Sequence, residues 1–161
     1  MSDRPIFGVT GWKNAGKTTL TERLVAELVR RGWRIATVKH AHHDADIDRP
    51  GTDSFRHRAA GATEVALVTA GRYAIMREQA EPALADVLAR LAPADLVLVE
   101  GFKNEAHPKI EVRADNEQPM DAAAFNIVAI AAVARGADTL PWFSRDDVAG
   151  IADFIAARVG R

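Results

Sequence analysis

The chain has 161 residues, a length typical of one domain, and 48% of them are hydrophobic, which excludes a disordered polar chain. Its formal net charge is −1, and its lysine and arginine residues are spread along the sequence, which excludes a broad basic field for nucleic acid. There is no cysteine, so disulfides, thiolate metal ligands and thiol catalysis are excluded as well.

Neither a targeting segment nor a membrane span is expected. The N-terminal residues lack the apolar core of a secretory signal, and the longest nearly apolar stretch, residues 122–134, is too short to cross a bilayer. We therefore expect a single cytoplasmic domain over residues 1–161, with no membrane and no nucleic-acid partner.

The first predicted elements alternate between strand and helix. Residues 5–10 are short, apolar and β-branched near their end, as in a buried strand, and a glycine-rich loop follows them. Residues 18–31 carry apolar side chains mostly on one side, which predicts a helix, and Gly32 is a natural stop. Residues 34–39 predict a second strand, and the polar residues 40–51 predict a long loop.

The middle of the chain predicts a helix, a hairpin and another helix. Thr52 is the expected N-cap of a helix over residues 53–60. Residues 64–69 and 73–76 predict two strands joined as a hairpin, and residues 83–91 have helical spacing of their leucines.

The last third adds more strands and a final helix. Residues 96–100, 109–112 and 127–133 are apolar segments that predict strands, and Ser-Arg-Asp-Asp at 144–147 resembles a capping box that opens a helix. Strands that alternate with helices, several of them apolar on both faces, predict an α/β fold. We expect a mostly parallel central sheet, helices on both faces and extra edge strands.

A phosphate-binding motif lies between the first predicted strand and the first predicted helix. Residues 11–18 read Gly-Trp-Lys-Asn-Ala-Gly-Lys-Thr, the Walker A pattern, which indicates a P-loop NTPase-like fold. Backbone N–H groups of the loop and the helix N-terminus would face the phosphates, Lys17 would reach the β and γ phosphates, and Thr18 would ligate Mg²⁺. The predicted nucleotide-binding residues are Gly11, Trp12, Lys13, Asn14, Ala15, Gly16, Lys17, Thr18 and Thr19.

Two of these loop residues have more than one interpretation. Some dimeric P-loop proteins carry a lysine that reaches the partner's nucleotide, but it directly follows the first glycine, where this chain has Trp12. We therefore favour Lys13 as a solvated surface lysine. Trp12 packs either beside the nucleotide or against a partner chain.

A carboxylate ends the apolar strand over residues 96–100. P-loop enzymes need such a group to hold Mg²⁺ or its waters, or to orient the attacking water, and Glu100 fits this requirement. Together with Lys17 it is the predicted catalytic pair, and together with Thr18 it is the predicted Mg²⁺ site. The alternative is a strand that merely ends in an acidic residue. Asp95 precedes the strand and should lie at its other end.

The loop after the second predicted strand is rich in histidine and aspartate and has three interpretations. It is a solvated acidic loop, a transition-metal site at His42, His43 and Asp44, or a switch segment that senses the nucleotide. Adjacent side chains of an extended segment point to opposite faces, which disfavours the metal site. In a switch segment an aspartate, Asp53 among others, would approach Mg²⁺. The switch-loop candidates are Lys39, His40, His42, His43, Asp44, Asp46, Asp48 and Asp53.

Taken together, these motifs resemble the molybdopterin-guanine dinucleotide biosynthesis adapter proteins, the MobB family. Beyond the Walker A motif, the resemblance rests on Lys-His-Ala-His-His-Asp-Ala-Asp-Ile-Asp at 39–48, Pro-Gly-Thr-Asp-Ser at 50–54 with Arg58 and Ala-Gly-Ala at 60–62, Leu-Val-Leu-Val-Glu-Gly-Phe-Lys at 96–103, and Lys-Ile-Glu-Val at 109–112. It covers nearly the whole chain, and the His-His-Asp segment joined to Pro-Gly-x-Asp-Ser is far more specific than Walker A alone.

The resemblance implies a function that residue chemistry alone does not give. It implies a homodimer that binds GTP with Mg²⁺ and hydrolyses GTP slowly while it assists a molybdenum cofactor guanylyltransferase. Molybdopterin or its guanine dinucleotide form is a possible ligand. The chain has no Asn-Lys-x-Asp motif for guanine, although Arg135 or Asp138 follows a late strand where base-reading residues often lie. The alternatives are a P-loop small-molecule kinase or nucleotidyltransferase and a metal-delivery GTPase, which usually carries the cysteine that this chain lacks.

The predicted strands at 73–76 and 109–112 fall outside the simple strand–helix alternation. We therefore expect both at a sheet edge, where apolar side chains such as Ile75 and Ile110 are a liability unless they are covered. Pairing with a second copy through a two-fold axis would cover them.

Overall fold

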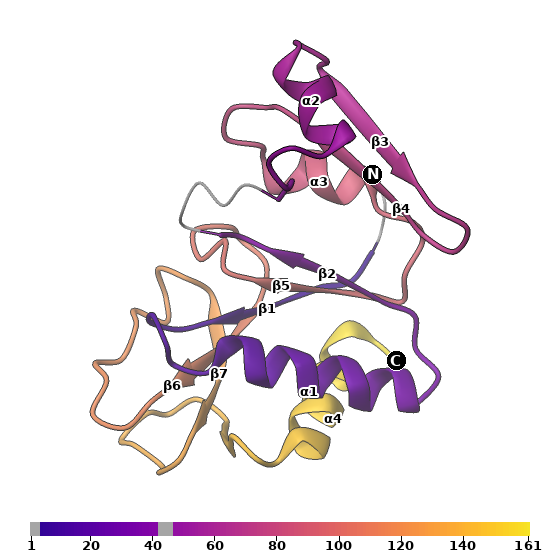
Figure 1. Ribbon diagram of the computed structural model, residues 1–161. Helices are drawn as coiled ribbons and strands as arrows, with labels where there is room; N and C mark the ends of the chain where they lie inside the picture. Colours follow the sequence, from indigo (N-terminus) through magenta and orange to yellow (C-terminus); the bar gives the residue numbers. More distant parts are fainter. Residues whose placement is uncertain (1–3, 42–46) are drawn as a thin grey trace. The chain divides into compact units, whose positions relative to one another are not determined.

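The computed structural model describes residues 4–41 and 47–161. They form two compact units, one made of Met1–His40 with Val87–Arg161 and the other of Ala41–Asp86 (Figure 1). The expectation of a single domain stays a prediction.

The larger unit contains a six-stranded sheet in the order β2-β5-β1-β6-β7-β8, and every pair of neighbouring strands in it is parallel. Parallel strands bring their carboxyl ends to one edge, so the ends of β1 and β5 meet there, with Val9 paired to Glu100. The strands are β1 (Ile6–Thr10), β2 (Ile35–Lys39), β5 (Leu96–Glu100), β6 (Lys109–Arg113), β7 (Ile127–Ala132) and β8 (Trp142–Ser144).

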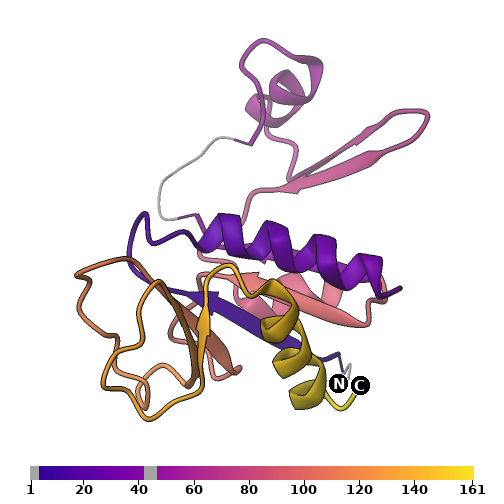
Figure 2. The same ribbon diagram turned by 90° about the horizontal axis from the view of Figure 1, so that it is seen from below.

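The core lies between one face of this sheet and two helices, α1 (Lys17–Arg30) and α4 (Val148–Val159), which lie side by side (Figure 1 and Figure 2). Alternate strand residues such as Phe7 and Val9 point into it, as the two-residue period of a strand requires. Leu24 of α1 and Ile151 of α4 meet them there, and all four side chains are fully buried. The predicted α/β fold with a mostly parallel sheet is confirmed.

The start of β5 is tied to the C-terminus of the chain. Asp95 accepts hydrogen bonds from the backbone and guanidinium of Arg34 and lies 2.9 Å from Nη1 of Arg161. Arg161 also lies over the ring of Trp33, 4.8 Å from its centroid. The hydrogen bonds from Arg34 are the main reason why the pKa of Asp95 is lower than usual. Asp95 thus lies at the far end of β5 from Glu100, as predicted.

The smaller unit holds α2 (Asp53–Ala59) and an antiparallel hairpin of β3 (Glu64–Val68) and β4 (Tyr73–Arg77). Thr52 is the N-cap of α2, because its side chain accepts a hydrogen bond from the backbone N–H of Phe55. Both the hairpin and this cap are confirmed predictions. A further short helix, α3 (Leu84–Arg90), begins in this unit and ends in the larger one.

The placement predicted for residues 109–112 is wrong. The strand that contains them, β6, lies inside the sheet between β1 and β7, and both Ile110 and Val112 are fully buried. Its place outside the simple strand–helix alternation does not put it at an edge. Its polar side chains are satisfied inside the sheet, where Lys109 donates from Nζ to the backbone carbonyls of Glu105, His107 and Phe125. Glu111 accepts from the backbone N–H of Met120 and pairs with Arg113.

The start of the last helix also differs from the prediction. Its N-cap is Asp147, which accepts a hydrogen bond from the backbone N–H of Gly150. Ser144 is the last residue of β8, a three-residue strand that the sequence did not predict. Its hydroxyl accepts from the N–H of Asp146 instead of capping the helix.

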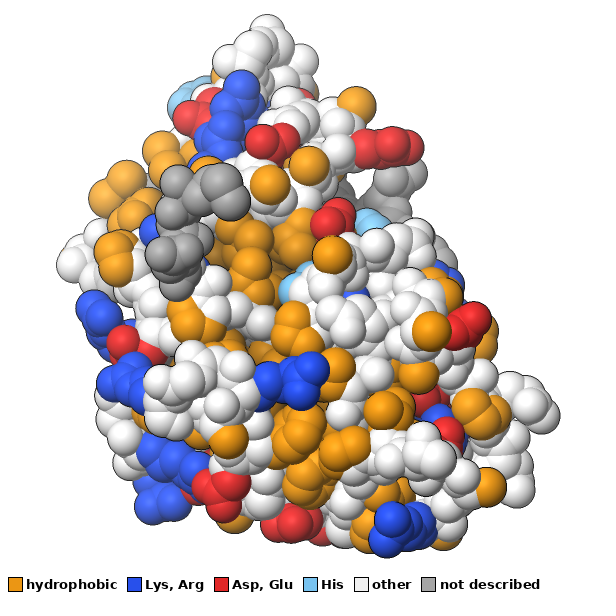
Figure 3. All heavy atoms as spheres, turned by 180° about the vertical axis from the view of Figure 1, so that it is seen from behind, with side chains coloured by type: hydrophobic (Ala, Val, Ile, Leu, Met, Phe, Trp, Pro, Cys, Tyr) orange, Lys and Arg blue, Asp and Glu red, His pale blue; other side chains and the backbone are white. Residues whose placement is uncertain are grey.

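The surface carries charges of both signs. Figure 3 shows lysine and arginine side chains intermixed with aspartate and glutamate on one face, in keeping with the net charge of −1. Among the described residues, no helix has both the length and the apolar character needed to cross a membrane.

Candidate nucleotide-binding site

The Walker A residues form a tight loop between β1 and α1, and the backbone explains its two glycines. Gly11 has a φ of 148° and Gly16 a φ of 101°, both in the region that L side chains rarely adopt. A Cβ atom at Gly11 would lie 2.3 Å from the carbonyl oxygen of Val112 in β6. Asn14 also has a positive φ, of 65°. The loop is therefore seated against the sheet, in the tight conformation by which a Walker A backbone cradles an anion.

Lys17 folds back over this loop. Its Nζ donates to the carbonyl oxygens of Gly11 at 3.0 Å and Trp12 at 2.5 Å, so the ammonium group spans the concave side of the loop. Burial is the largest influence on Lys17 and lowers its pKa, while the carboxylates of Glu100 and Glu117 act in the opposite direction. This is the position from which a lysine can exchange backbone carbonyls for phosphate oxygens.

Beside the loop, three side chains from three different elements meet. Thr18 Oγ1 donates to Glu100 Oε1 at 2.9 Å. Lys39 Nζ, from the end of β2, lies 3.2 Å from Thr18 Oγ1 and 3.3 Å from the same carboxylate oxygen. Glu100 is only 8% exposed. A hydroxyl and a carboxylate oxygen side by side are hard oxygen ligands, so this pair fits Mg²⁺.

The outer part of the loop carries Trp12, Lys13 and Asn14, all exposed. The indole N–H of Trp12 donates to the carbonyl of Gln118 at 2.7 Å, which fixes the ring, and Lys103 Nζ lies 5.8 Å from the ring centroid. The exposure of Lys13 agrees with a surface lysine. Nothing in the sequence around Lys103 indicates that it lies near Trp12.

His40 follows Lys39 at the same edge of the sheet. Its ring stacks on Phe102 with the ring centroids 4.5 Å apart, and its backbone N–H donates to the backbone carbonyl of Glu100. Gly101, between Glu100 and Phe102, has a φ of 89°, and a Cβ there would lie 2.9 Å from Cβ of His40, so both the backbone and the space favour glycine. The predicted residues Lys39 and His40 therefore lie next to Glu100.

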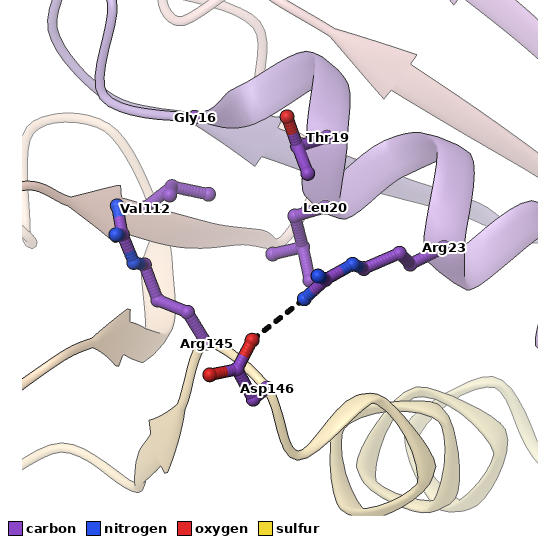
Figure 4. A pocket seen from close by; sticks show the side chains of 7 residues that line it. All are labelled: Gly16, Thr19, Leu20, Arg23, Val112, Arg145 and Asp146. Carbon is purple, nitrogen blue, oxygen red and sulfur yellow. Dashed lines mark hydrogen bonds and ion pairs between the residues drawn. The ribbon is translucent and has the colours of Figure 1, made fainter.

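On its other flank the loop borders a pocket of ≈ 170 Å³ (Figure 4). Arg145 donates from Nη1 to the carbonyl of the buried Ala15 at 3.0 Å, and Arg23 pairs with Asp146 at 2.7 Å. Residues 145 and 146 were predicted only as part of a capping box, and no local pattern places them beside the phosphate loop. The lining residues are Gly16, Thr19, Leu20, Arg23, Val112, Arg145 and Asp146.

The histidine- and aspartate-rich loop is only partly described. His42, His43, Asp44 and Asp46 lie outside the described residues. Asp48 accepts hydrogen bonds from Thr52 and Ser54 and so organises the start of α2, while Asp53 is exposed in the first turn of that helix. A Mg²⁺ role for either aspartate stays a prediction. In residues 4–41 and 47–161, no three His, Asp or Glu residues are grouped as a metal site.

A partly buried histidine, His107, lies just before β6. The Nε2 atom of His107 is buried and has no hydrogen-bond partner among the described residues. Burial, with a smaller contribution from the charge of Lys109, lowers the pKa of His107 to about 4, so it is neutral at pH 7. We assign it no role in the nucleotide site.

Comparison with known proteins extends this picture. The family model for molybdopterin guanine dinucleotide synthesis protein B, MobB, matches residues 6–134. The molybdopterin-guanine dinucleotide biosynthesis adapter protein of Escherichia coli K12 is 35% identical over 159 residues, which are 94% of this chain and 91% of that protein. The Haemophilus influenzae protein of the same name is 46% identical over 109 residues, which are 66% of this chain and 61% of that protein.

Solved structures give the same result. The crystal structure of a MobB homologue from Bacillus stearothermophilus has a TM-score of 0.72 and 34% identity, covering 96% of this chain and 97% of that chain. Bacillus subtilis MobB has a TM-score of 0.76 and 28% identity, with the same two coverages.

Proposed function

This chain belongs to the family of molybdopterin guanine dinucleotide synthesis protein B, and on that premise we propose that it is a GTP-binding adapter with slow GTPase activity. It assists a separate guanylyltransferase that attaches GMP to molybdopterin, in biosynthesis of the molybdenum cofactor. The observation that carries the proposal is the glycine loop with Lys17, Thr18 and Glu100 brought together at one edge of the sheet.

The loop geometry supports triphosphate binding. Lys17 would exchange its two loop carbonyls for β- and γ-phosphate oxygens, and Thr18 and Glu100 would hold Mg²⁺ through the oxygen atoms that now share a hydrogen bond. The bound metal would neutralise charge on the phosphates. Lys39 lies close enough to Glu100 to hold that carboxylate in place.

A reconstituted transfer reaction tests the adapter role. We expect the purified guanylyltransferase, given GTP and molybdopterin, to form more guanine dinucleotide product when this chain is added. The Lys17→Ala variant should add nothing, because it lacks the phosphate contact. Product formation that is the same with this chain as with an equal mass of albumin would refute the adapter role.

The hairpin of the smaller unit supports the proposed homodimer. Tyr73 and Ile75 in β4 are 70% and 56% exposed, and Leu67 in β3 is 51% exposed, so an apolar surface needs a cover. We propose that a second copy of the chain covers this apolar surface. The strand β6 is buried and therefore takes no part in the proposed interface.

Light scattering tests this dimer. The wild-type chain should have twice its mass of 17.4 kDa at micromolar concentration, and Ile75→Asp should shift the mass towards 17.4 kDa, because a charge replaces a buried apolar contact. Val133→Asp, at a similarly exposed apolar residue next to β7, should leave the mass unchanged. A wild-type monomer contradicts the dimer, and a dimer that survives Ile75→Asp places the interface elsewhere.

A further inference from the structure

The pocket beside the phosphate loop is lined by residues of that loop, of α1, of β6 and of the turn between β8 and α4. α1 contributes Thr19 and Arg23, and the turn between β8 and α4 contributes Arg145 and Asp146 (Figure 4). Gly16 of the loop itself forms one wall, so the pocket is continuous with the predicted phosphate site. It contains both apolar surface, from Leu20, and charged groups.

The phosphate site gives the bound nucleotide a direction. Thr18 and Thr19 are neighbours at the start of α1, and successive helix residues point about 100° apart. Thr18 points to Glu100, where Mg²⁺ would bridge the β and γ phosphates, whereas Thr19 lines the pocket. The γ-phosphate of the nucleotide therefore lies on the Glu100 side of the loop. The α-phosphate and the nucleoside lie on the side of the pocket.

Asp146 is held at the mouth of this pocket. Its Oδ1 accepts from Arg23 Nη1 at 2.7 Å, and its own backbone N–H donates to the hydroxyl of Ser144. Among the described residues only Arg23 donates to this carboxylate, and the side chain is 86% exposed. A carboxylate has about four lone-pair sites, so it can accept further hydrogen bonds beside the one from Arg23.

We propose that the pocket takes the nucleoside end of the nucleotide and that Asp146 selects guanine. This inference rests on the nucleotide binding proposed above. The N1–H and N2–H₂ groups of guanine are two adjacent donors that match the two oxygens of a carboxylate. Adenine presents the N1 lone pair at the same edge, which a carboxylate repels. The chain thus reads guanine without the Asn-Lys-x-Asp sequence.

Three other charged groups, Asp138, Arg145 and Arg23, are already engaged. Asp138 accepts from Arg113 Nη1 at 2.8 Å and does not line the pocket. Arg145 is held by the carbonyl of Ala15, so it forms a wall beside the phosphate loop. Arg23 orients the Asp146 carboxylate. Among the residues that line the pocket, Asp146 is the only acid.

Calorimetry of the full chain with GTP, xanthosine triphosphate and ATP, each with Mg²⁺, tests the assignment. The wild type should prefer GTP to ATP and to xanthosine triphosphate by about 10- to 100-fold, as for one bidentate base contact. Asp146→Asn should reverse the preference between guanine and xanthine, because the amide presents one acceptor to N1–H and one donor to the xanthine carbonyl. Asp146→Ala should lose selectivity without gaining xanthine binding.

Two further variants separate base reading from loss of an ion pair. Asp153→Asn removes an exposed aspartate that also pairs with an arginine, Arg31 at 2.6 Å, and should bind all three nucleotides like the wild type. Arg23→Ala breaks the pair with Asp146 from the other side but keeps the carboxylate, so it should weaken the preference for GTP less than Asp146→Ala does.

Each contrary result has a distinct meaning. Equal GTP and ATP binding by the wild type, lost on Lys17→Ala, keeps the phosphate site but overturns the role of Asp146. If Asp146→Asn keeps the wild-type preference for GTP, the role of Asp146 is overturned too. It is also overturned if Asp153→Asn shows the change from guanine to xanthine preference that is expected of Asp146→Asn. A wild-type chain that binds none of the three overturns the proposed function as well.

Discussion

Replacing Lys17 with alanine is expected to abolish tight binding of Mg–GTP while leaving the fold intact. Lys17 supplies the cation that spans the loop, and within residues 4–41 and 47–161 its Nζ donates only to the carbonyls of Gly11 and Trp12, so no core contact is lost. Charge-assisted hydrogen bonds to phosphate are about twice as strong as neutral ones, and at least two would disappear. Affinity for GTP should fall by about 10²-fold or more.

Isothermal calorimetry measures this loss, and Lys13→Ala is the matched control. Lys13 belongs to the same loop and carries the same charge, but it is exposed and interpreted as a surface residue. Its replacement should change the affinity only a few-fold, through weaker long-range attraction. An unchanged affinity in Lys17→Ala, with an unchanged melting curve, would rule out the Walker A interpretation.

Replacing Glu100 with glutamine is expected to lower GTP hydrolysis by about 10²-fold or more while binding changes much less. The amide keeps the shape and can still accept the hydrogen bond from Thr18, so the loop should keep its geometry. It removes the negative charge that holds Mg²⁺ or its water, and it leaves Lys39 without its counter-ion. The transition state therefore loses more stabilisation than the ground state.

Single-turnover hydrolysis, stopped by acid quench and measured as total GDP formed, separates the cleavage step from product release. Glu105→Gln serves as the control, since this exposed acid lies in the loop just after β5 and takes no part in the cluster of Thr18, Lys39 and Glu100. It should hydrolyse GTP at the wild-type rate. If Glu100→Gln does so as well, Glu100 has only a structural role.

The part of the site made by local sequence could be predicted. The loop, the first turn of α1 and the strand that ends at Glu100 follow from glycine spacing and apolar runs, which report local backbone and burial. The position of Lys39 at a strand end could be predicted, but its contact with Glu100 could not. Parallel pairing of β2 with β5 brings the two residues together.

Elements whose environment depends on distant residues could not be predicted. Lys109 and Glu111 alternate with apolar residues, which is typical of a half-exposed strand, yet both are buried because carbonyls and Arg113 satisfy them. The three residues of β8 are too few for any periodic signal. Arg145 reaches Ala15 across 130 positions of sequence, so nothing local reveals that it borders the phosphate loop.

The contact between Arg161 and Asp95 has a practical consequence for measurements on a sensor surface. Asp95 lies just before the start of β5, whereas the phosphate loop follows the end of β1. Because β1 and β5 are parallel neighbours, Asp95 and the loop lie at opposite ends of the sheet. The C-terminal residue is thus held at the end of the sheet away from the loop, by an ion pair and by the ring of Trp33. A chain tethered through its C-terminus would leave the loop facing the solution, whereas random coupling through lysines would attach some molecules through Lys13 or Lys39 and block it.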